Sequence, residues 1–455
     1  MLDILLKDLD TYYKMGTYYY SLSTPIHNSQ KAPFDYFKVL NKTQREVSFY
    51  FETPDKKLAM VGIGDLEVIF GGVQDISNWR RQLPIISRKS KIPGVGPFIF
   101  GSYPFFDELM ITDTWGEFGR GCHILPQMVI TLFEDQLYLT INVYGKDLVS
   151  LRQDVIAQWE LCHELSSKSS VLVSNQSNIL SQSEIGVDQW LETVDLAVGT
   201  LKSSSQIEKI VLAREMIVEK SEEIIPSDVL EQLKEQQANT FFFSLSWHDN
   251  TFIGATPERL LKASDDEFVT ASIAGSTPRG KNKIEDDKLA NALLNDKKNR
   301  YEHSIVLSRI KEDLSALTGN KVIESEVSIL KNKDIQHLHV PLSVKRSESV
   351  SFSLGIETLH PTPALGGEPK NLSSEWLKNH EPLARGLYGA PIGWQSLIED
   401  NGEYVVGIRS ALINGKQARL FAGCGIVADS EKELEKMETL VKFKPMLRGL
   451  GGSVS

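Results

Sequence analysis

Residues 404–422 read Tyr404-Val-Val-Gly-Ile-Arg-Ser-Ala-Leu-Ile-Asn-Gly-Lys-Gln-Ala-Arg-Leu-Phe-Ala422. Two runs with strand-like composition, Tyr404–Ala411 and Gln417–Ala422, flank the dipeptide Asn414-Gly415. Asn-Gly is typical of a tight hairpin, because both residues tolerate the positive φ angles that such a turn requires. The stretch therefore predicts a pair of antiparallel strands.

The same arrangement recurs along the rest of the chain. Asp249-Asn250 and Asn401-Gly402 mark two more tight turns beside strand-like runs. Further strands are expected at Val47–Phe51, Leu58–Ile63, Gln136–Val143, Ile210–Val218, Thr240–Ser246, Thr251–Ala255 and Phe268–Ala274, and helices at about 147–165, 187–201, 284–318 and 430–448. The mixture predicts an α+β fold with large antiparallel β-sheets and helices packed on the outside.

A polar stretch divides this pattern. Residues 166–184 are rich in Ser, Asn and Gln, which is typical of an exposed connection. We therefore expect an N-terminal β-rich subdomain at residues 1–185 and a catalytic core at residues 186–455. A surface loop inside one intertwined α+β unit explains the composition equally well, and strand-rich halves on both sides allow a duplicated architecture.

Composition argues against several classes of function. The 455 residues are 41% hydrophobic and 24% charged, with a formal net charge of −11. A nucleic-acid surface needs concentrated Lys and Arg, which this chain lacks. No apolar run approaches the length of a membrane span, and the N-terminus has no signal-peptide pattern, so a cytoplasmic protein is expected. An acidic protein can still bind an anionic substrate if local cations or a metal reverse the field in one pocket.

The C-terminal helix carries two neighbouring carboxylates. Leu434, Met437 and Val441 have helical spacing and are expected to face the core. Glu435 and Glu438 lie one residue further round, at the border of that face. Hard oxygen ligands at this spacing suit Mg²⁺, although a solvated, salt-bridging face would have the same pattern.

Glu302 stands early in another expected helix, within Asn299-Arg-Tyr-Glu-His-Ser-Ile-Val306. A single Glu at such a position is usually a surface residue or a partner of the helix dipole. It gains importance only if its helix and the C-terminal helix face one cavity, which the sequence alone does not reveal.

Nine motifs carry a family resemblance when they are taken together. They are Lys209-Ile-Val-Leu-Ala-Arg214, Gly254-Ala-Thr-Pro-Glu258, Ser272-Ile-Ala-Gly-Ser276, Arg300-Tyr-Glu-His303, Leu359-His-Pro-Thr-Pro-Ala364, Arg385-Gly-Leu-Tyr-Gly389, Gly407-Ile-Arg409, Phe421-Ala-Gly-Cys-Gly-Ile-Val427 and Glu438-Thr-Leu-Val-Lys442. In this order they resemble the chorismate-utilising enzymes: anthranilate synthase large subunits and aminodeoxychorismate, salicylate and isochorismate synthases. The resemblance runs from about residue 205 to 450. Phe98–Asp107 also resembles the N-terminal part of isochorismate synthases of the longer, menaquinone type.

The resemblance implies the fold of that family and a role for each matching position. Lys209 matches the general base and Glu258 the general acid. Glu302 and Glu438 match Mg²⁺ ligands, with Glu435 close by. The substrate-binding positions that it implies are Arg409, Lys442, Gly423, Gly425, Tyr388, His360, Ala274 and Gly275. Of these, Tyr388 matches an aromatic wall and His360 a histidine near the substrate ring, although a histidine between Leu and Pro is more often structural.

These residue types suit the conversion of chorismate to isochorismate, an isomerisation of the hydroxymutase type. Water adds at C2 and the C4 hydroxyl leaves, while the double bonds shift. Because water is a poor nucleophile and hydroxide a poor leaving group, a base and an acid are needed on opposite faces. Lys209 has to be neutral to accept a proton, and Glu258 has to be protonated to donate one.

Two positions discriminate among the relatives. Lys209 stands where ammonia-using relatives carry a residue unsuited to activating water, and Ala274 where aminodeoxychorismate synthases place a nucleophilic lysine. We therefore expect isochorismate synthesis for menaquinone production, without a glutamine amidotransferase subunit. A salicylate synthase, which also removes pyruvate, and a non-catalytic chorismate-binding subunit or sensor remain as alternatives.

Overall fold

Two large β-sheets form the centre of the protein. The computed structural model describes residues 1–27, 29–42, 48–87, 90–107, 111–168, 178–204, 206–347 and 349–453. The larger sheet has the strand order β10 (Ile179–Glu184), β11 (Lys209–Lys220), β23 (Gln417–Ile426), β22 (Ser410–Asn414), β13 (Asn250–Thr256), β12 (Phe241–Trp247), β2 (Ser48–Glu52), β3 (Leu58–Ile63), β8 (Met128–Phe133), β9 (Gln136–Gly145), β1 (Tyr18–Ile26) and β5 (Ile85–Ser87), with β19 (Gly367–Glu368) beside β11. The smaller sheet has the order β16 (Ile323–Glu324), β18 (Ile335–Lys345), β15 (Glu267–Pro278), β14 (Arg259–Ala263), β21 (Gly402–Val406), β20 (Pro391–Ser396), β6 (Phe98–Ser102), β7 (Cys122–Leu125) and β4 (Glu67–Phe70), with β17 (Ser328–Lys331) beside β18.

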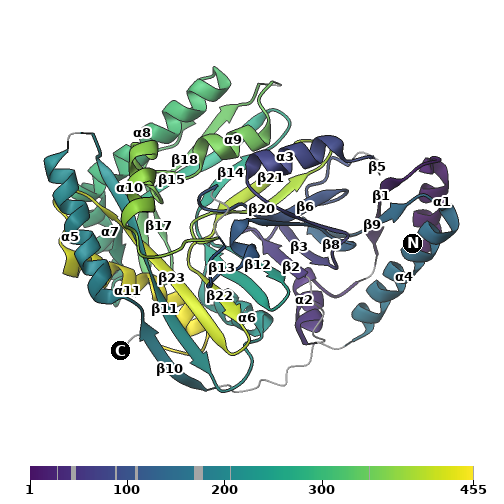
Figure 1. Ribbon diagram of the computed structural model, residues 1–455, viewed down its shortest axis with the longest axis horizontal. Coiled ribbons are helices and arrows are strands. Elements are labelled where there is room, and N and C mark those ends of the chain that lie inside the picture. The colour runs from purple at the N-terminus through teal and green to yellow at the C-terminus, as the bar shows by residue number, and fades with distance from the viewer. Residues whose placement is uncertain are drawn as a thin grey trace.

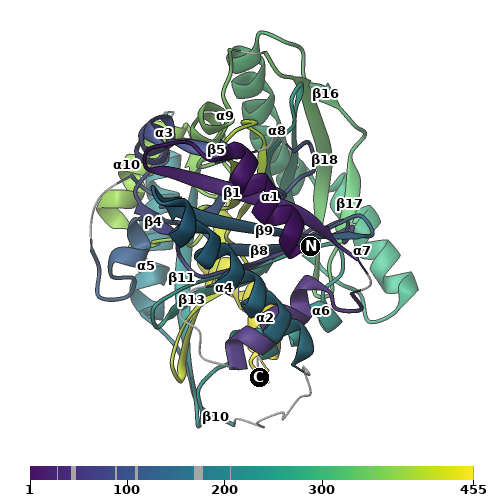
Figure 2. The same cartoon turned by 90° about the vertical axis from the view of Figure 1, so that its right-hand side faces the viewer.

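The helices lie around these sheets (Figure 1). They are α1 (Leu2–Tyr12), α2 (Pro33–Lys42), α3 (Val73–Gln82), α4 (Leu148–Ser167), α5 (Val187–Ser203), α6 (Pro226–Gln236), α7 (Lys283–Asn295), α8 (Lys297–Thr318), α9 (Phe352–Leu359), α10 (Lys370–His380) and α11 (Lys432–Gly449), with a 3₁₀ turn at Glu117–Arg120. The two termini lie towards opposite ends of the long axis, and α1 and α4 cover β1 and β9 at the N-terminal end (Figure 2). Within the described ranges, none of the helices has the length and apolar composition needed to cross a membrane.

Pairing in both sheets is antiparallel wherever it is described, except between β1 and β5, which are parallel. The predicted α+β class with large antiparallel sheets is therefore confirmed. Both sheets combine strands from either side of residue 185: β2 pairs with β12 in the larger sheet, and β6 pairs with β20 in the smaller one. Of the predicted connection at 166–184, residues 169–177 lie outside the described part of the chain, and its end forms β10.

Aromatic side chains fill the space between the sheets. The rings of Phe49 from β2 and Phe100 from β6 stack with centroids 4.3 Å apart. Neighbouring positions on these strands, Phe51 and Phe98, are buried in the same cluster with Trp394 of β20. Alternate residues of a strand point to the same face, so these two faces interdigitate into one apolar layer.

Some elements agree with their sequence pattern closely. The helix expected at 187–201 is α5, which buries Trp190, Val194 and Leu201. Helices α7 and α8 lie in the range 284–318, where helical structure is expected. Strand β2 begins at Ser48; Val47, its predicted first residue, lies outside the described residues.

The predicted core stripe of the C-terminal helix is wrong. Leu434 and Met437 are 60% and 59% exposed, whereas Glu435, Thr439 and Phe443 are buried. The inward face packs against β23 and α6, where polar side chains are required: the hydroxyl of Thr439 accepts a hydrogen bond from Nε of Arg214 at 2.7 Å. A polar site has therefore overridden the hydrophobic pattern that usually sets the orientation of a helix.

The strand predicted at Tyr404–Ala411 is interrupted. Strand β21 ends at Val406 in the smaller sheet, and β22 begins at Ser410 in the larger one. Between them, Arg409 has a φ of 51°, which turns the chain from one sheet to the other. This crossing places the Arg409 side chain at the junction of the two sheets rather than on a regular strand.

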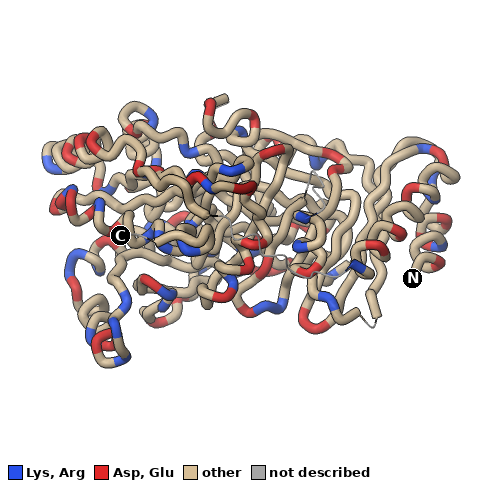
Figure 3. Tube along the Cα trace, turned by 90° about the horizontal axis from the view of Figure 1, so that it is seen from below, with Lys and Arg blue, Asp and Glu red and all other residues tan. Residues whose placement is uncertain are grey.

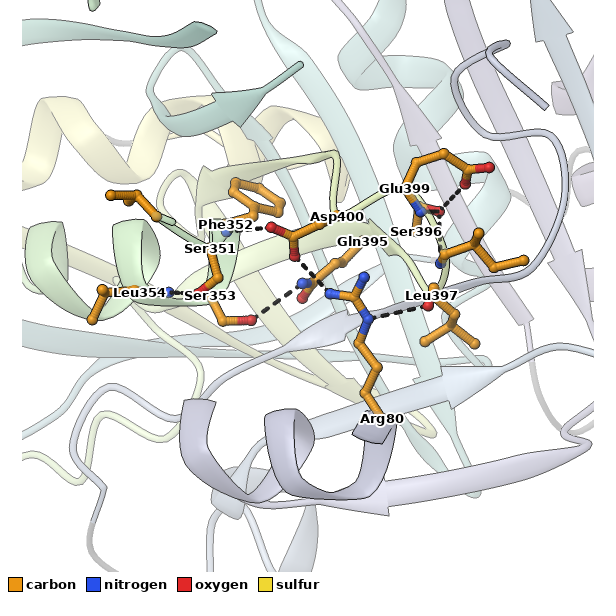
Figure 4. Close-up of polar contacts among 12 residues, drawn as sticks. Arg80, Ser351, Phe352, Ser353, Leu354, Gln395, Ser396, Leu397, Glu399 and Asp400 are labelled. Atoms are coloured by element: carbon orange, nitrogen blue, oxygen red, sulfur yellow. Dashed lines mark hydrogen bonds and ion pairs between the residues drawn. The ribbon is translucent and has the colours of Figure 1, made fainter. Parts of the chain in front are cut away.

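Segments with Lys and Arg are interspersed with segments with Asp and Glu (Figure 3), as the acidic, mixed composition suggests. One polar cluster ties distant segments together at the β20–β21 turn (Figure 4). The carboxylate of Asp400 accepts hydrogen bonds from Nη1 of Arg80 on α3 at 2.7 Å and from the backbone N–H of Phe352 at 2.9 Å, and it also pairs with Arg346. Arg80 and Arg346 are both mostly shielded from solvent.

We expect Asp400→Asn to destabilise the protein without affecting its chemistry. The amide keeps the shape but removes the charge that two guanidinium groups share, so the free energy of unfolding should fall by about 1–3 kcal/mol. Urea unfolding followed by circular dichroism measures this loss. An unchanged unfolding midpoint would show that the cluster contributes nothing to stability.

Candidate active site

One pocket collects most of the residues singled out in the sequence. It lies where β11, β13, β15, β18 and β23 meet α8, α11 and the segments around Leu365 and Arg385. Its lining residues are Val211, Ala213, Pro257, Glu258, Ile273, Ala274, Gly275, Ser276, Glu302, His337, Ala364, Leu365, Arg385, Tyr388, Gly389, Ile408, Arg409, Phe421, Ala422, Gly423, Cys424, Gly425, Glu438 and Lys442. Helices α8 and α11 therefore do present Glu302 and Glu438 to one cavity.

Lys209 contacts this pocket through Glu302. It is the first residue of β11, its side chain is 1% exposed, and Nζ donates to Oε1 of Glu302 at 2.9 Å. Gly425 lies opposite, on β23. A Cβ at Gly425 would stand 2.5 Å from Cε of Lys209 and 2.9 Å from Oε1 of Glu302. Only glycine leaves room for the ion pair at this position.

Glu258 is buried in the turn between β13 and β14. Burial raises the pKa of its carboxyl to about 7, although the positive charges of Lys209, Arg409 and Lys442 act in the opposite direction. A carboxyl with this pKa is substantially protonated near neutral pH. It can therefore donate a proton, which an ordinary Glu at that pH cannot do.

Arg409 reaches the pocket from the crossing between the sheets. Its Nη2 lies 3.3 Å from Nε2 of His337, and Nδ1 of His337 lies 2.9 Å from the hydroxyl of Ser276. Burial, with the nearby charges of Arg409 and Lys442, holds the pKa of His337 well below its usual range. The imidazole is therefore neutral, and since a guanidinium only donates, Nε2 accepts from Arg409. The neutral imidazole does not neutralise the charge of Arg409, which can therefore bind an anionic ligand.

Lys442 and Glu438 form an ion pair on α11. Nζ of Lys442 lies 2.6 Å from Oε1 of Glu438 and donates to the backbone carbonyl of Gly423 at 2.8 Å. Burial alone would lower the pKa of Lys442, but the Glu438 carboxylate outweighs it and the pKa is raised. The ammonium therefore stays charged beside Gly423, within the pocket wall.

Glu435 lies one turn before Thr439 on the same helix. It is buried, and Nζ of Lys298 lies 3.3 Å from its Oε1. Burial raises the pKa of Glu435, and the Glu438 carboxylate adds to the effect, while Lys298 opposes it. The raised pKa of Glu435 therefore reflects its burial first and the repulsion between two neighbouring carboxylates second.

The carboxylates of Glu302, Glu435 and Glu438 suit a hard divalent cation, because all their donors are oxygen atoms. Across the described residues, no group of three or more His, Cys, Asp or Glu side chains is arranged to hold a metal ion. Each of the three carboxylates instead pairs with a lysine ammonium. The donor chemistry thus fits Mg²⁺, and the lysines supply the positive charge that these carboxylates require.

His360 is not among the pocket-lining residues. Its Nε2 hydrogen-bonds to the backbone carbonyl of Phe105 at 3.0 Å, and the two rings meet edge to face. Burial lowers the pKa of His360 to about 3, so its imidazole is neutral and bonded to the protein backbone. The residues that follow it, Ala364 and Leu365, do line the pocket.

The other predicted substrate-binding residues lie together. Tyr388 stacks on Phe421, with ring centroids 5.4 Å apart. Ala274 and Gly275 occupy an irregularity of β15, where Gly275 has a φ of 71°. Sequence reasoning missed residues that also line the pocket: Val211, Ala213, Ser276, His337, Leu365, Arg385 and Phe421. For His337, an available signal was the polar pair Gln336-His337 near the start of a strand that is otherwise rich in Leu and Val.

Comparison with known proteins identifies the family. The family model described as chorismate binding enzyme matches residues 12–451. The chain belongs to this family. The isochorismate synthase MenF of Bacillus subtilis (strain 168) is 34% identical over 435 residues, which cover 92% of this chain and 91% of that protein. The resemblance predicted from the nine motifs is therefore confirmed.

Solved structures of the family share the fold. MenF from Escherichia coli, described as a menaquinone-specific isochorismate synthase, superimposes with a TM-score of 0.82 at 23% identity and covers 99% of each chain. Anthranilate synthase component I from Streptococcus pneumoniae superimposes with a TM-score of 0.69 at 17% identity, over 86% of this chain and 92% of that one. The two-sheet architecture is common to all three proteins.

The titration of Glu258 can be measured through stability. Its pKa is about 7 in the folded protein and near 4.5 when unfolded. Between these values the folded state binds more protons, so the stability contributed by this group is lost as pH rises from 4.5 to 7, by on the order of 3 kcal/mol. Glu258→Gln should therefore gain stability relative to the parent across this window, as measured by urea unfolding at several pH values. Parallel pH profiles of the two proteins would contradict the raised pKa.

Proposed function

We propose that this protein is a Mg²⁺-dependent isochorismate synthase that converts chorismate to isochorismate, and that it serves menaquinone biosynthesis in the cytoplasm. The main support is the buried Glu258 carboxyl with a pKa of about 7, in the same pocket as the Lys209–Glu302 pair. The names of the Bacillus and Escherichia relatives agree with this activity and pathway.

Binding of a dicarboxylate requires positive charge in an acidic protein. Arg409 and Lys442 supply it, and both face the pocket. The backbone between Gly423 and Gly425 approaches the same space, where side chains would obstruct it. Tyr388 and Phe421 provide an apolar face against which a six-membered ring can pack.

Lys209 and Glu258 divide the proton transfers. In its neutral amine form, Lys209 removes a proton from water as the oxygen bonds to C2. Glu258 gives its proton to the C4 hydroxyl, which leaves as water while the two double bonds shift. Each transfer by a positioned side chain contributes about 10²–10⁴ to the rate. The carboxylate of Glu258 and the ammonium of Lys209 then exchange a proton with solvent to restore the starting state.

We propose that Glu302 and Glu438 hold the Mg²⁺, with Glu435 beside them as a further or water-mediated contact. When bound, the ion would neutralise and orient one carboxylate of the substrate. The lysines that now pair with these glutamates would then be free to face the substrate. A glutamine amidotransferase partner is not expected, because the nucleophile is water rather than ammonia.

The nitrogen-using members of the family fit the pocket less well. Ala274 presents only a methyl group to the cavity where aminodeoxychorismate synthases have a nucleophilic lysine. Salicylate synthase shares the water-activating lysine and stands as the alternative product class. A chorismate-binding sensor would not need a protonated carboxyl at neutral pH, so Glu258 favours an enzyme.

We expect the purified protein to convert chorismate to isochorismate in the presence of Mg²⁺, and to stop when EDTA is added. Liquid chromatography separates chorismate, isochorismate and salicylate in one run. If salicylate and pyruvate form without a second enzyme, the proposal is wrong and the protein is a salicylate synthase. A protein that binds chorismate but yields no product would be a sensor or subunit.

Gly425→Ala should reduce turnover by about 100-fold, because the added methyl group displaces the Lys209–Glu302 pair, and displacements of about 1 Å are that costly. Gly199→Ala on α5 is a matched control, since a Cβ there meets nothing within 4 Å. Both variants are assayed as above, and their unfolding midpoints are compared. Full activity of Gly425→Ala would refute the tight geometry of the site.

A further inference from the structure

Among the residues that the structure describes, no strand pairs with the edge of β11 that faces away from β23 where this edge passes the pocket. One side of β11 pairs with β23 along residues 210–219. On the other side, β19 pairs only with Lys209 and Ile210, and β10 only from Met216 onwards. The backbone around Val211 and Ala213 therefore has an open edge inside the protein. Buried N–H and C=O groups are costly unless they find partners.

The backbone carbonyl of Gly366 accepts from the N–H of Val211 at 3.1 Å, and two side chains bind the edge beyond it. Oε1 of Glu381 accepts from the backbone N–H of Ala213 at 2.7 Å, and Nη2 of Arg385 donates to the carbonyl of Val211 at 2.6 Å. The two side chains also bind each other: Nε of Arg385 donates to Oε2 of Glu381 at 2.6 Å, and Nη2 of Arg385 donates to Oε1 of Glu381 at 2.7 Å. Both are only 2% exposed. A buried carboxylate and guanidinium thus stand in for a strand beside the pocket.

Arg385 also reaches two other parts of the pocket wall, one through its guanidinium and one through its backbone carbonyl. Nη1 of Arg385 donates to the backbone carbonyl of Leu365 at 2.7 Å. The backbone carbonyl of Arg385 accepts a hydrogen bond from the N–H of Tyr388 at 2.8 Å. The Arg385 guanidinium lies over the ring of Phe105, with its Cζ atom 4.2 Å from the ring centroid. The strand that begins with Lys209, the Leu365 segment and the Tyr388 wall are therefore linked through one residue.

Although Arg385 lines the pocket, its charge is already matched. The Glu381 carboxylate accepts two hydrogen bonds from its guanidinium, and the backbone carbonyls of Leu365 and Val211 also accept hydrogen bonds from it. Arg409, in contrast, contacts the neutral imidazole of His337. Charge available for an anionic substrate thus belongs to Arg409, while Arg385 is committed to the protein.

We propose that Glu381 and Arg385 are positioning residues for the reaction: the side-chain pair holds the Lys209 end of β11 and the Leu365 segment at the spacing that catalysis needs. This role rests on the proposed turnover of chorismate. Removing the pair should act on the alignment of the site more than on the attraction of the substrate, because Arg409 and Lys442 remain in place.

Glu381→Gln is the first test. Glutamine keeps an acceptor for the Ala213 N–H but leaves the Arg385 charge unbalanced. We expect kcat to fall about 100-fold, because the strand carrying Lys209 shifts, while KM for chorismate stays within about threefold of the parent or falls, since the pocket gains net positive charge. Steady-state kinetics with Mg²⁺ separates the two constants.

Arg385→Lys is the second variant, and it decides the matter if Glu381→Gln fails to fold. A lysine keeps the charge next to Glu381, but one ammonium cannot reach Glu381, Val211 and Leu365 together. The same split is expected, with a smaller fall in kcat, about 10-fold.

Asp400→Asn is the matched control. It is also a carboxylate-to-amide change beside guanidinium groups, but it lies outside the pocket. It should lower the unfolding midpoint and keep the parent's kcat and KM. Parental kcat in a folded Glu381→Gln or Arg385→Lys variant would overturn the positioning role, and so would a loss that appears only as a raised KM. Absence of chorismate turnover in the unmodified protein would overturn the proposed function itself, and the positioning role with it.

Discussion

The ion pair between Lys209 and Glu302 is the constraint on which the rest of the site depends. It joins the first residue of β11, in the larger sheet, to helix α8, which packs on the smaller sheet, and both partners are largely removed from water. A buried ion pair is costly unless its geometry is well supported. Here Gly425 supplies the space, and the Glu381–Arg385 pair holds the strand's open edge. The contacts at Gly425 and at the Glu381–Arg385 pair therefore help to fix the position of the Lys209 side chain.

Glu258 shows how desolvation and charge compete in this pocket. Three cations, on Lys209, Arg409 and Lys442, would hold a solvated carboxyl ionised, yet the pKa is about 7 because burial outweighs them. Burial, together with the charges of Arg409 and Lys442, keeps His337 neutral. A substantially protonated Glu258 thus lies beside the cations of Arg409 and Lys442 near neutral pH, a state that an isolated Glu would not adopt. This separation of protonation states is what acid–base chemistry at one ring requires.

Whether a charged side chain in or beside the pocket is neutralised depends on the group that it contacts, not on its residue type. Each of three glutamates has a lysine within 3.3 Å, and Arg385 has its own glutamate, whereas Arg409 faces a neutral ring. A protein with a net charge of −11 can in this way present net positive charge to an anion at one point. The lysine-paired glutamates are at the same time the oxygen donors that a divalent cation would use.

The sequence by itself determined the antiparallel α+β class, the family and most of the pocket, because turns such as Asn414-Gly415 and nine ordered motifs are local features. It also identified Glu302 and Glu438, though not that they face one cavity. Only the tertiary structure decided the orientation of α11, where Glu435 is buried and Leu434 exposed, since a polar site outweighed the apolar stripe. It alone showed the break at Arg409, the hydrogen bond of His360 to Phe105 outside the pocket lining, and the presence of His337 and Arg385 in that lining. These features arise from contacts between segments that are distant in sequence, and no local pattern encodes such contacts.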